Sequence, residues 1–148
     1  MDEDIAREFS SVNQVSYQIT IDGEENDHNR TRILANGGPT FSRILKNLVS
    51  IKRSALPVTI TLRMHVHANN VDSIEKAYAE LCRLMGNDER FTFFFHKVSD
   101  LGGDQKEKIL SYREYGEIVK GIIDRNNINN ARSEATASGY ICYASKPN

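Results

Sequence analysis

Hydrophobic and polar residues alternate along three separate segments of the chain, and this period of two predicts three β-strands. The first segment is Gln14–Ile21, in which every second residue from Val15 is apolar. The second, Pro57–Val66, is rich in the β-branched residues that strands favour. The third, Arg90–Val98, carries a run of phenylalanines that is apolar on both faces, so we expect this strand to be covered on both sides.

A segment with a helical repeat of apolar residues follows each predicted strand. The first predicted helix begins after Thr40, a suitable N-cap, and the second begins after the asparagine pair at 69–70. Gly86 suits the residue that follows a helix, and the third helix covers about residues 105–125. The polar stretch 22–38 is predicted to be a loop, and the chain after Asn126 an irregular or mobile connection.

This order predicts an α/β fold of three consecutive βα units, with parallel strands joined by right-handed crossovers. An open doubly wound sheet and a slice of a βα barrel both have this order. In either fold a ligand binds beyond the C-terminal ends of the strands. Those ends are Asp22-Gly23 with the following loop, His65–Asn70 and Lys97–Gly103.

The first of these strand ends opens a loop of mixed charge. Asp22-Gly23 is a common turn pair, but the loop is long enough to carry a function. Gly37-Gly38 lies just before a helix and could present backbone N–H groups to an anion, although the sequence lacks a phosphate-loop pattern.

Three polar residues alternate along the second strand and are expected to share one face. His65 and His67 could hold a metal, but no third ligand is near in sequence, and packing or hydrogen bonding is the commoner role. Arg63 could bind a carboxylate or phosphate, or form a salt bridge within a barrel layer. His96 and Lys97 end the third strand, where they could reach a ligand or face solvent.

Composition narrows the classes of function. The 148 residues suit one domain, and the 39% hydrophobic and 26% charged content is typical of globular proteins. The net charge of −1 provides no basic field, so we expect no nucleic acid partner. No apolar run approaches the ~20 residues that a membrane span needs, and the acidic N-terminal segment is not a signal peptide.

The cysteine content also limits the chemistry. Cys82 and Cys142 are the two cysteines of the chain, and they do not resemble a secreted disulfide framework, so a cytoplasmic location is expected. Two thiols cannot ligate a whole iron–sulfur cluster or a four-thiolate zinc site. Cys82 falls in a helical segment, where we expect a small core residue.

The residues at the strand ends follow a distinctive order. Thr20-Ile21-Asp22-Gly23 is followed by His28-Asn29, by Arg32, by a glycine pair and by the helix that opens at Thr40–Ile44. This order resembles the SPASM-type branch of the radical S-adenosylmethionine (SAM) enzymes, which includes sulfatase- and peptide-maturing enzymes. Asn29 stands where that branch usually has Asp. The segment LRMHVHANNVDSI resembles the next barrel unit, and GYICYASKPN resembles the start of the SPASM segment.

The resemblance implies a partial (β/α)6 TIM-like barrel, of which residues 1–125 supply units four to six. Residues 126–148 would form a linker and the start of a truncated SPASM segment. The implied reaction is reductive SAM cleavage at a 4Fe–4S cluster, with hydrogen abstraction from a protein, peptide or small-molecule substrate. Thr20, Asp22 and Arg43 are the implied cofactor-binding residues, and Cys142 is the implied metal ligand.

The chain lacks the Cys-xxx-Cys-xx-Cys motif that holds the cluster in this family. We therefore expect a fragment that needs the N-terminal half of the barrel, is inactive alone and holds neither SAM nor a cluster stably by itself. A second interpretation is a small non-catalytic α/β binding or interaction domain. A third is a phosphate- or nucleotide-binding protein that uses the Gly37-Gly38 turn.

Overall fold

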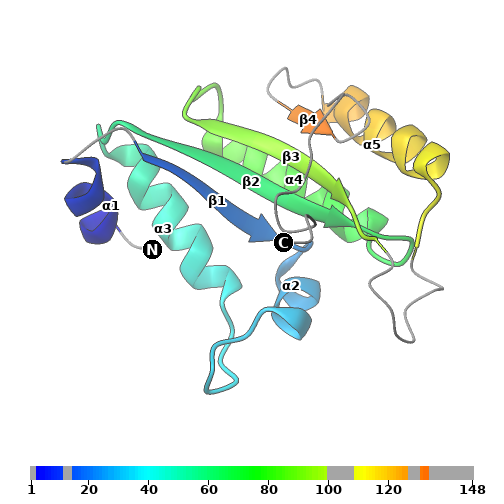
Figure 1. The fold of residues 1–148 in the computed structure, drawn as a ribbon, viewed down its shortest axis with the longest axis horizontal. Helices are drawn as coiled ribbons and strands as arrows, with labels where there is room; N and C mark the ends of the chain where they lie inside the picture. Colours follow the sequence, from blue (N-terminus) through cyan, green and yellow to red (C-terminus); the bar gives the residue numbers. More distant parts are fainter. Residues whose placement is uncertain (1–2, 12–14, 100–108, 127–130, 134–148) are drawn as a thin grey trace, which may run out of the picture.

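The computed structural model describes residues 3–11, 15–99, 109–126 and 131–133. The helices and strands within these ranges are shown in Figure 1. Their order is α1 (Glu3–Ser10), β1 (Val15–Ile21), α2 (Glu25–Thr31), α3 (Phe41–Arg53), β2 (Val58–Val66), α4 (Val71–Met85), β3 (Phe91–Lys97), α5 (Tyr112–Asn126) and β4 (Ala131–Ser133).

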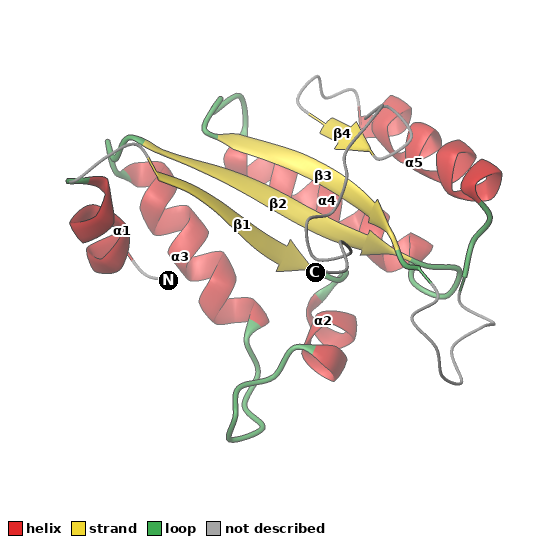
Figure 2. Ribbon diagram, viewed as in Figure 1, coloured by secondary structure: helices red, strands yellow, loops and turns green. Residues whose placement is uncertain are grey.

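The four described strands form one parallel sheet in the order β1-β2-β3-β4. Each strand therefore lies beside its neighbour in sequence, and right-handed crossovers carry α3, α4 and α5 to the same side of the sheet (Figure 2). The prediction of an α/β fold with consecutive βα units is confirmed. The reversal of strand order that marks a doubly wound sheet does not occur among these strands.

The hydrophobic core lies between the sheet and this helical layer. Residues of β2 are alternately buried and half-buried, and the buried ones face the helices. Tyr78 of α4 packs edge-on against Phe93 and Phe95 of β3, with ring centroids 4.9 and 5.2 Å away. Each such aromatic pair contributes about 0.5–1.5 kcal/mol beyond the area that it buries. Cys82 is buried in the same core, as expected.

The opposite side of the sheet is not covered by any described helix, and we call it the open face. Along each strand its residues alternate with those that face the core, and most of them are polar. They are Ser16, Gln18 and Thr20 of β1, Thr59, Thr61, Arg63 and His65 of β2, and Thr92, Phe94 and His96 of β3. Hydroxyl groups join neighbouring strands here, at 2.7 Å between Ser16 and Thr59 and at 3.2 Å between Thr61 and Thr92.

Several sequence predictions need correction. β3 buries only alternate phenylalanines fully, and Phe94 is half-buried, so the expectation that both faces are covered is wrong for the described residues. Helix α2 lies inside the predicted loop, and β4 lies inside the predicted irregular connection. Neither α1 nor β4 was predicted. These short elements lack a long apolar stripe, and contacts with the rest of the molecule stabilise them.

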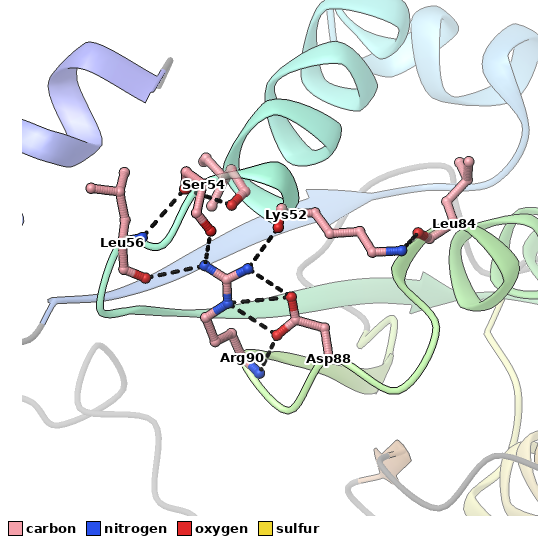
Figure 3. Close-up of polar contacts among 7 residues, drawn as sticks. Lys52, Ser54, Leu56, Leu84, Asp88 and Arg90 are labelled. Atoms are coloured by element: carbon pink, nitrogen blue, oxygen red, sulfur yellow. Dashed lines mark hydrogen bonds and ion pairs between the residues drawn. The ribbon is translucent and has the colours of Figure 1, made fainter.

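At the amino edge of the sheet, one arginine joins the end of α3 to the start of β3 (Figure 3). The Arg90 guanidinium donates to the carbonyl oxygens of Lys52, Ser54 and Leu56 at 2.9, 3.0 and 3.1 Å. Carbonyls at a helix end have no partner within the helix, so this side chain supplies the missing donors for Lys52 and Ser54, whereas the Leu56 carbonyl also accepts from the Val58 N–H at 2.9 Å. Asp88 accepts from the same guanidinium at 2.7 Å and balances its charge.

We predict that Arg90→Ala lowers the free energy of unfolding by about 2–4 kcal/mol, because the carbonyls of Lys52 and Ser54 lose their side-chain donor and Asp88 loses its counter-ion. Urea titration followed by far-UV circular dichroism measures this difference. Arg83→Ala is the matched control, since Arg83 is exposed on α4, and it should change the value by less than about 0.5 kcal/mol. Equal losses in the two variants would contradict the role given to Arg90.

Candidate functional site

Polar residues that follow β1 and belong to β2 and β3 meet at the carboxyl edge of the sheet. Asp22 accepts a hydrogen bond from Arg32 Nε at 2.6 Å, and its other oxygen lies 3.1 Å from His65 Nδ1. The rings of His65 and His96 have their centroids 5.2 Å apart. We call these four residues the carboxyl-edge cluster. The parallel register, with Ile21 beside Met64, brings the first strand end next to His65.

One nitrogen of the cluster, His65 Nδ1, faces both a carboxylate and a guanidinium. His65 Nδ1 lies 3.1 Å from Asp22 Oδ1 and 3.2 Å from Arg32 Nη2. The nitrogen donates to the carboxylate when it carries a proton and accepts from the guanidinium when it does not, so the two bonds exclude each other. His65 Nδ1 is therefore placed to bond either the carboxylate of Asp22 or the guanidinium of Arg32.

The electrostatics keep Asp22 charged. Burial by itself raises the pKa of the Asp22 carboxyl, but hydrogen bonds from His65 and Arg32, and their charges, outweigh burial and hold that pKa below its ordinary value. The carboxylate is thus an ionised acceptor at neutral pH, and Arg32 balances its charge.

A buried histidine fixes the loop that carries these groups. His28 is fully buried, and its Nδ1 accepts from the backbone N–H of Asp22 at 3.3 Å. Its Nε2 then carries the proton and donates to the Thr40 hydroxyl at 3.0 Å, which in turn donates to the Arg32 carbonyl at 2.5 Å. These three bonds join the end of β1, the end of α2 and the start of α3. Burial lowers the pKa of the His28 imidazole below its ordinary value.

Asn29 caps helix α3 in place of the predicted Thr40. The Asn29 Oδ1 accepts from the backbone N–H groups of Thr40 and Phe41, both at 3.0 Å. Thr40 is the first residue before the helix but makes no side-chain cap bond, because its hydroxyl belongs to the His28 chain of bonds. Asn70 likewise makes no cap bond for α4, and bonds instead to the His67 N–H and the His65 carbonyl.

Position 23 accommodates only a glycine, because a neighbouring side chain leaves no room for a Cβ atom. Gly23 has φ of +121°, and a Cβ there would lie 2.5 Å from the hydroxyl oxygen of Ser73. That hydroxyl accepts from the Glu24 N–H at 2.8 Å, so the first turn of α4 holds the start of the loop. The Asp-Gly pair is therefore more than a generic turn.

The predicted cofactor residues do not all come together. Thr20 lies on the open face beside Arg63, and Asp22 lies in the carboxyl-edge cluster. Arg43 is exposed in the first turns of α3 and makes no ion pair with the described part of the chain. Cys142 lies outside the described residues.

Within the ranges that the structure covers, no group of three or more His, Cys, Asp or Glu side chains could hold a metal ion. His65 belongs to the carboxyl-edge cluster, whereas His67 follows the strand and accepts from the Asn69 N–H. Cys82 is the free cysteine of this part, and burial raises the pKa of its thiol to about 11, so it stays protonated. The described residues therefore do not fit an iron–sulfur cluster.

The glycine turn offers little to an anion. The Gly37 N–H donates to the Leu34 carbonyl at 2.8 Å, and the Gly38 N–H donates to Asn36 Oδ1 at 3.1 Å. Both backbone donors on which a phosphate site would depend are thus already bonded. Separately, no helix in the described ranges has the length and apolar character needed to cross a membrane.

Sequence reasoning did not assign Arg32 to the site, although the residue was part of the recognised order. The signal that could have identified it is the carboxylate of Asp22, which directly follows a strand and needs a positive partner. Ser73 was also missed, since nothing in the sequence connects it to Gly23. The chain matches no known family model, and no curated protein is significantly similar to it.

We predict that Gly23→Ala destabilises the protein by about 2 kcal/mol or more, because the new methyl group meets the Ser73 hydroxyl at a φ that L residues rarely adopt. Chemical denaturation measures the change. Gly116→Ala is the matched control, since a Cβ at this α5 position meets nothing within 4 Å, and it should stabilise by about 0.5–1 kcal/mol. A neutral Gly23→Ala would show that the close approach is not real.

We further predict that the free energy of unfolding falls as the pH is lowered from about 7.5 to 5. The His28 imidazole has a pKa of about 6.5 in the unfolded state and a lower pKa in the folded state, so the unfolded state binds the proton more readily over this range. The contribution of His28 is complete above that pH and is lost toward its lowered folded pKa. The Asp22 contribution disappears at lower pH, below about 4. Urea titrations at both pH values should give a smaller pH dependence for His28→Gln than for the wild type. Equal slopes would contradict a buried neutral His28.

Proposed function

We propose that this chain forms the C-terminal part of a partial βα barrel of the radical SAM type, and that its carboxyl edge helps to bind SAM. One observation carries the proposal: a sequentially ordered parallel sheet has its helices on one side and a polar open face on the other. A barrel wall has this asymmetry, and barrel enzymes bind their ligands at the carboxyl edge, where Asp22, Arg32 and His65 meet.

The proposed cofactor contacts follow from chemistry and position. The Thr20 hydroxyl can bond ribose or amine groups, and a guanidinium can pair with the cofactor carboxylate. Arg43 is the guanidinium that the family resemblance suggests. Arg32 competes for this role, because its side chain is 39% exposed and already lies in the cluster. Asp22 serves mainly to orient Arg32 and His65.

The proposed role of this chain is limited to cofactor contact and the barrel wall. In enzymes of this type a 4Fe–4S cluster supplies the electron for SAM cleavage, but the described residues offer no ligand set for it. The N-terminal barrel half is therefore the proposed partner, and the substrate class stays open between a protein, a peptide and a small molecule. A cytoplasmic location belongs to the same proposal.

The alternative is a small non-catalytic α/β binding domain. The hydrophobic core favours this alternative, because the described sheet and helices bury the core between themselves without a closed barrel. Cooperative unfolding of a monomer that does not bind SAM would support this alternative over the first proposal.

The first test is anaerobic reconstitution of this chain with iron and sulfide. We expect no visible absorption corresponding to one cluster per chain, and no SAM cleavage after reduction. A stoichiometric cluster with SAM cleavage would contradict the proposed inactivity of this chain alone.

The second test measures weak SAM binding by calorimetry or NMR. We predict that Thr20→Val weakens binding by about fivefold, the equivalent of one hydrogen bond. Thr59→Val is the matched control, because Thr59 lies on the same open face near the amino edge, and it should leave binding unchanged. Equal effects of the two variants on the weak binding would count against the SAM site.

A further inference from the structure

The middle of the open face carries an arginine that the carboxyl-edge cluster does not use. Arg63 belongs to β2, and the sheet register places it between Thr20 of β1 and Phe94 of β3. We propose that Arg63 binds the oxyanion of a ligand, a carboxylate or a phosphate group, that lies across the open face. The site needs neither SAM nor a cluster, so it goes beyond the proposed function.

The first argument is an unsatisfied donor. Arg63 Nε is buried and has no hydrogen-bond acceptor among the described residues, and Arg63 forms no ion pair there. A buried charged donor without an acceptor is costly, so native structures normally supply one. Two half-buried arginines follow that rule, since Arg32 pairs with Asp22 and Arg90 pairs with Asp88. A bound oxyanion would supply the acceptor that Arg63 lacks.

The second argument is the charge of the open face. Asp22 directly follows the neighbouring strand β1 at the carboxyl edge, and Arg32 balances its charge at 2.6 Å. The open-face residues of the three long strands include no Asp or Glu, and their only other titratable groups are His65 and His96. Within the described ranges, the guanidinium of Arg63 is therefore a positive charge without a carboxylate counter-ion.

The third argument is the fit of the neighbouring groups. A guanidinium presents parallel N–H donors that match two oxygens of a carboxylate or phosphate. Thr20 offers a hydroxyl on one side, and Phe94 offers a half-buried aromatic ring on the other. This combination suits a ligand whose anionic group is attached to a planar or apolar part.

The test follows the Arg63 Nε–Hε resonance by NMR in the full chain labelled with ¹⁵N-arginine. Sodium acetate and sodium phosphate are the probes, and sodium chloride at equal ionic strength is the reference, all at one pH. We expect a saturable shift with acetate or phosphate but not with chloride. The loss of the signal in Arg63→Lys assigns it. The anion that saturates at lower concentration identifies the carboxylate or the phosphate as the preferred group.

Thermal unfolding provides a second readout. The preferred anion should raise the unfolding temperature of the wild type and of Arg83→Gln, but not of Arg63→Gln, because Arg83 is exposed on α4 and away from the sheet. If Arg63→Gln does not fold, the wild-type resonance decides the question alone. A shift that does not saturate, or that equals the shift with chloride, would overturn the proposal.

The outcomes also separate this site from the proposed SAM function. Saturable anion binding at Arg63 without any SAM binding would retain the anion site and reject the SAM site. SAM binding that depends on Thr20, with no specific anion shift at Arg63, would retain the SAM site and reject the anion site.

Discussion

The strict alternation along β2 is the constraint on which the rest of the structure depends. Apolar side chains of one parity meet the helices, and polar side chains of the other parity form the open face. A slip of one residue in register would exchange the two sets and place Arg63 and His65 in the core. Because β2 pairs with β1 on one side and β3 on the other, its alternation fixes the faces of both neighbours.

The two edges of the sheet are then held by polar groups rather than by apolar packing. At the amino edge Arg90 satisfies the carbonyls at the end of α3. At the carboxyl edge His28 and Asn29 hold the connection from β1 to α3. Such directional bonds position a loop that has no apolar stripe of its own, and they leave the side chains of Asp22 and Arg32 together at the rim.

Charge is distributed unevenly over the resulting surface. Asp22 is balanced by Arg32, and its pKa stays low because His65 and Arg32 together outweigh the effect of burial. Arg63, further down the same face, has no such balance among the described residues. The carboxyl edge and the middle of the open face are therefore distinct environments: the first joins a carboxylate, a guanidinium and an imidazole, and the second has a cation without a carboxylate partner in the described part of the chain.

The sequence by itself determined the three long strands, the three long helices and their parallel order, because the periods of two and about 3.6 residues reflect burial on one side of each element. It also indicated correctly that Cys82 is a core residue and that Gly86 follows a helix. Only the tertiary structure decided that α2 and β4 form, that Asn29 rather than Thr40 caps α3, and that Arg32 rather than Arg43 lies beside Asp22. The physical reason is that these features depend on hydrogen bonds and ion pairs between residues far apart in sequence, such as Gly23 near Ser73 or Asp22 near His65, which no local pattern records.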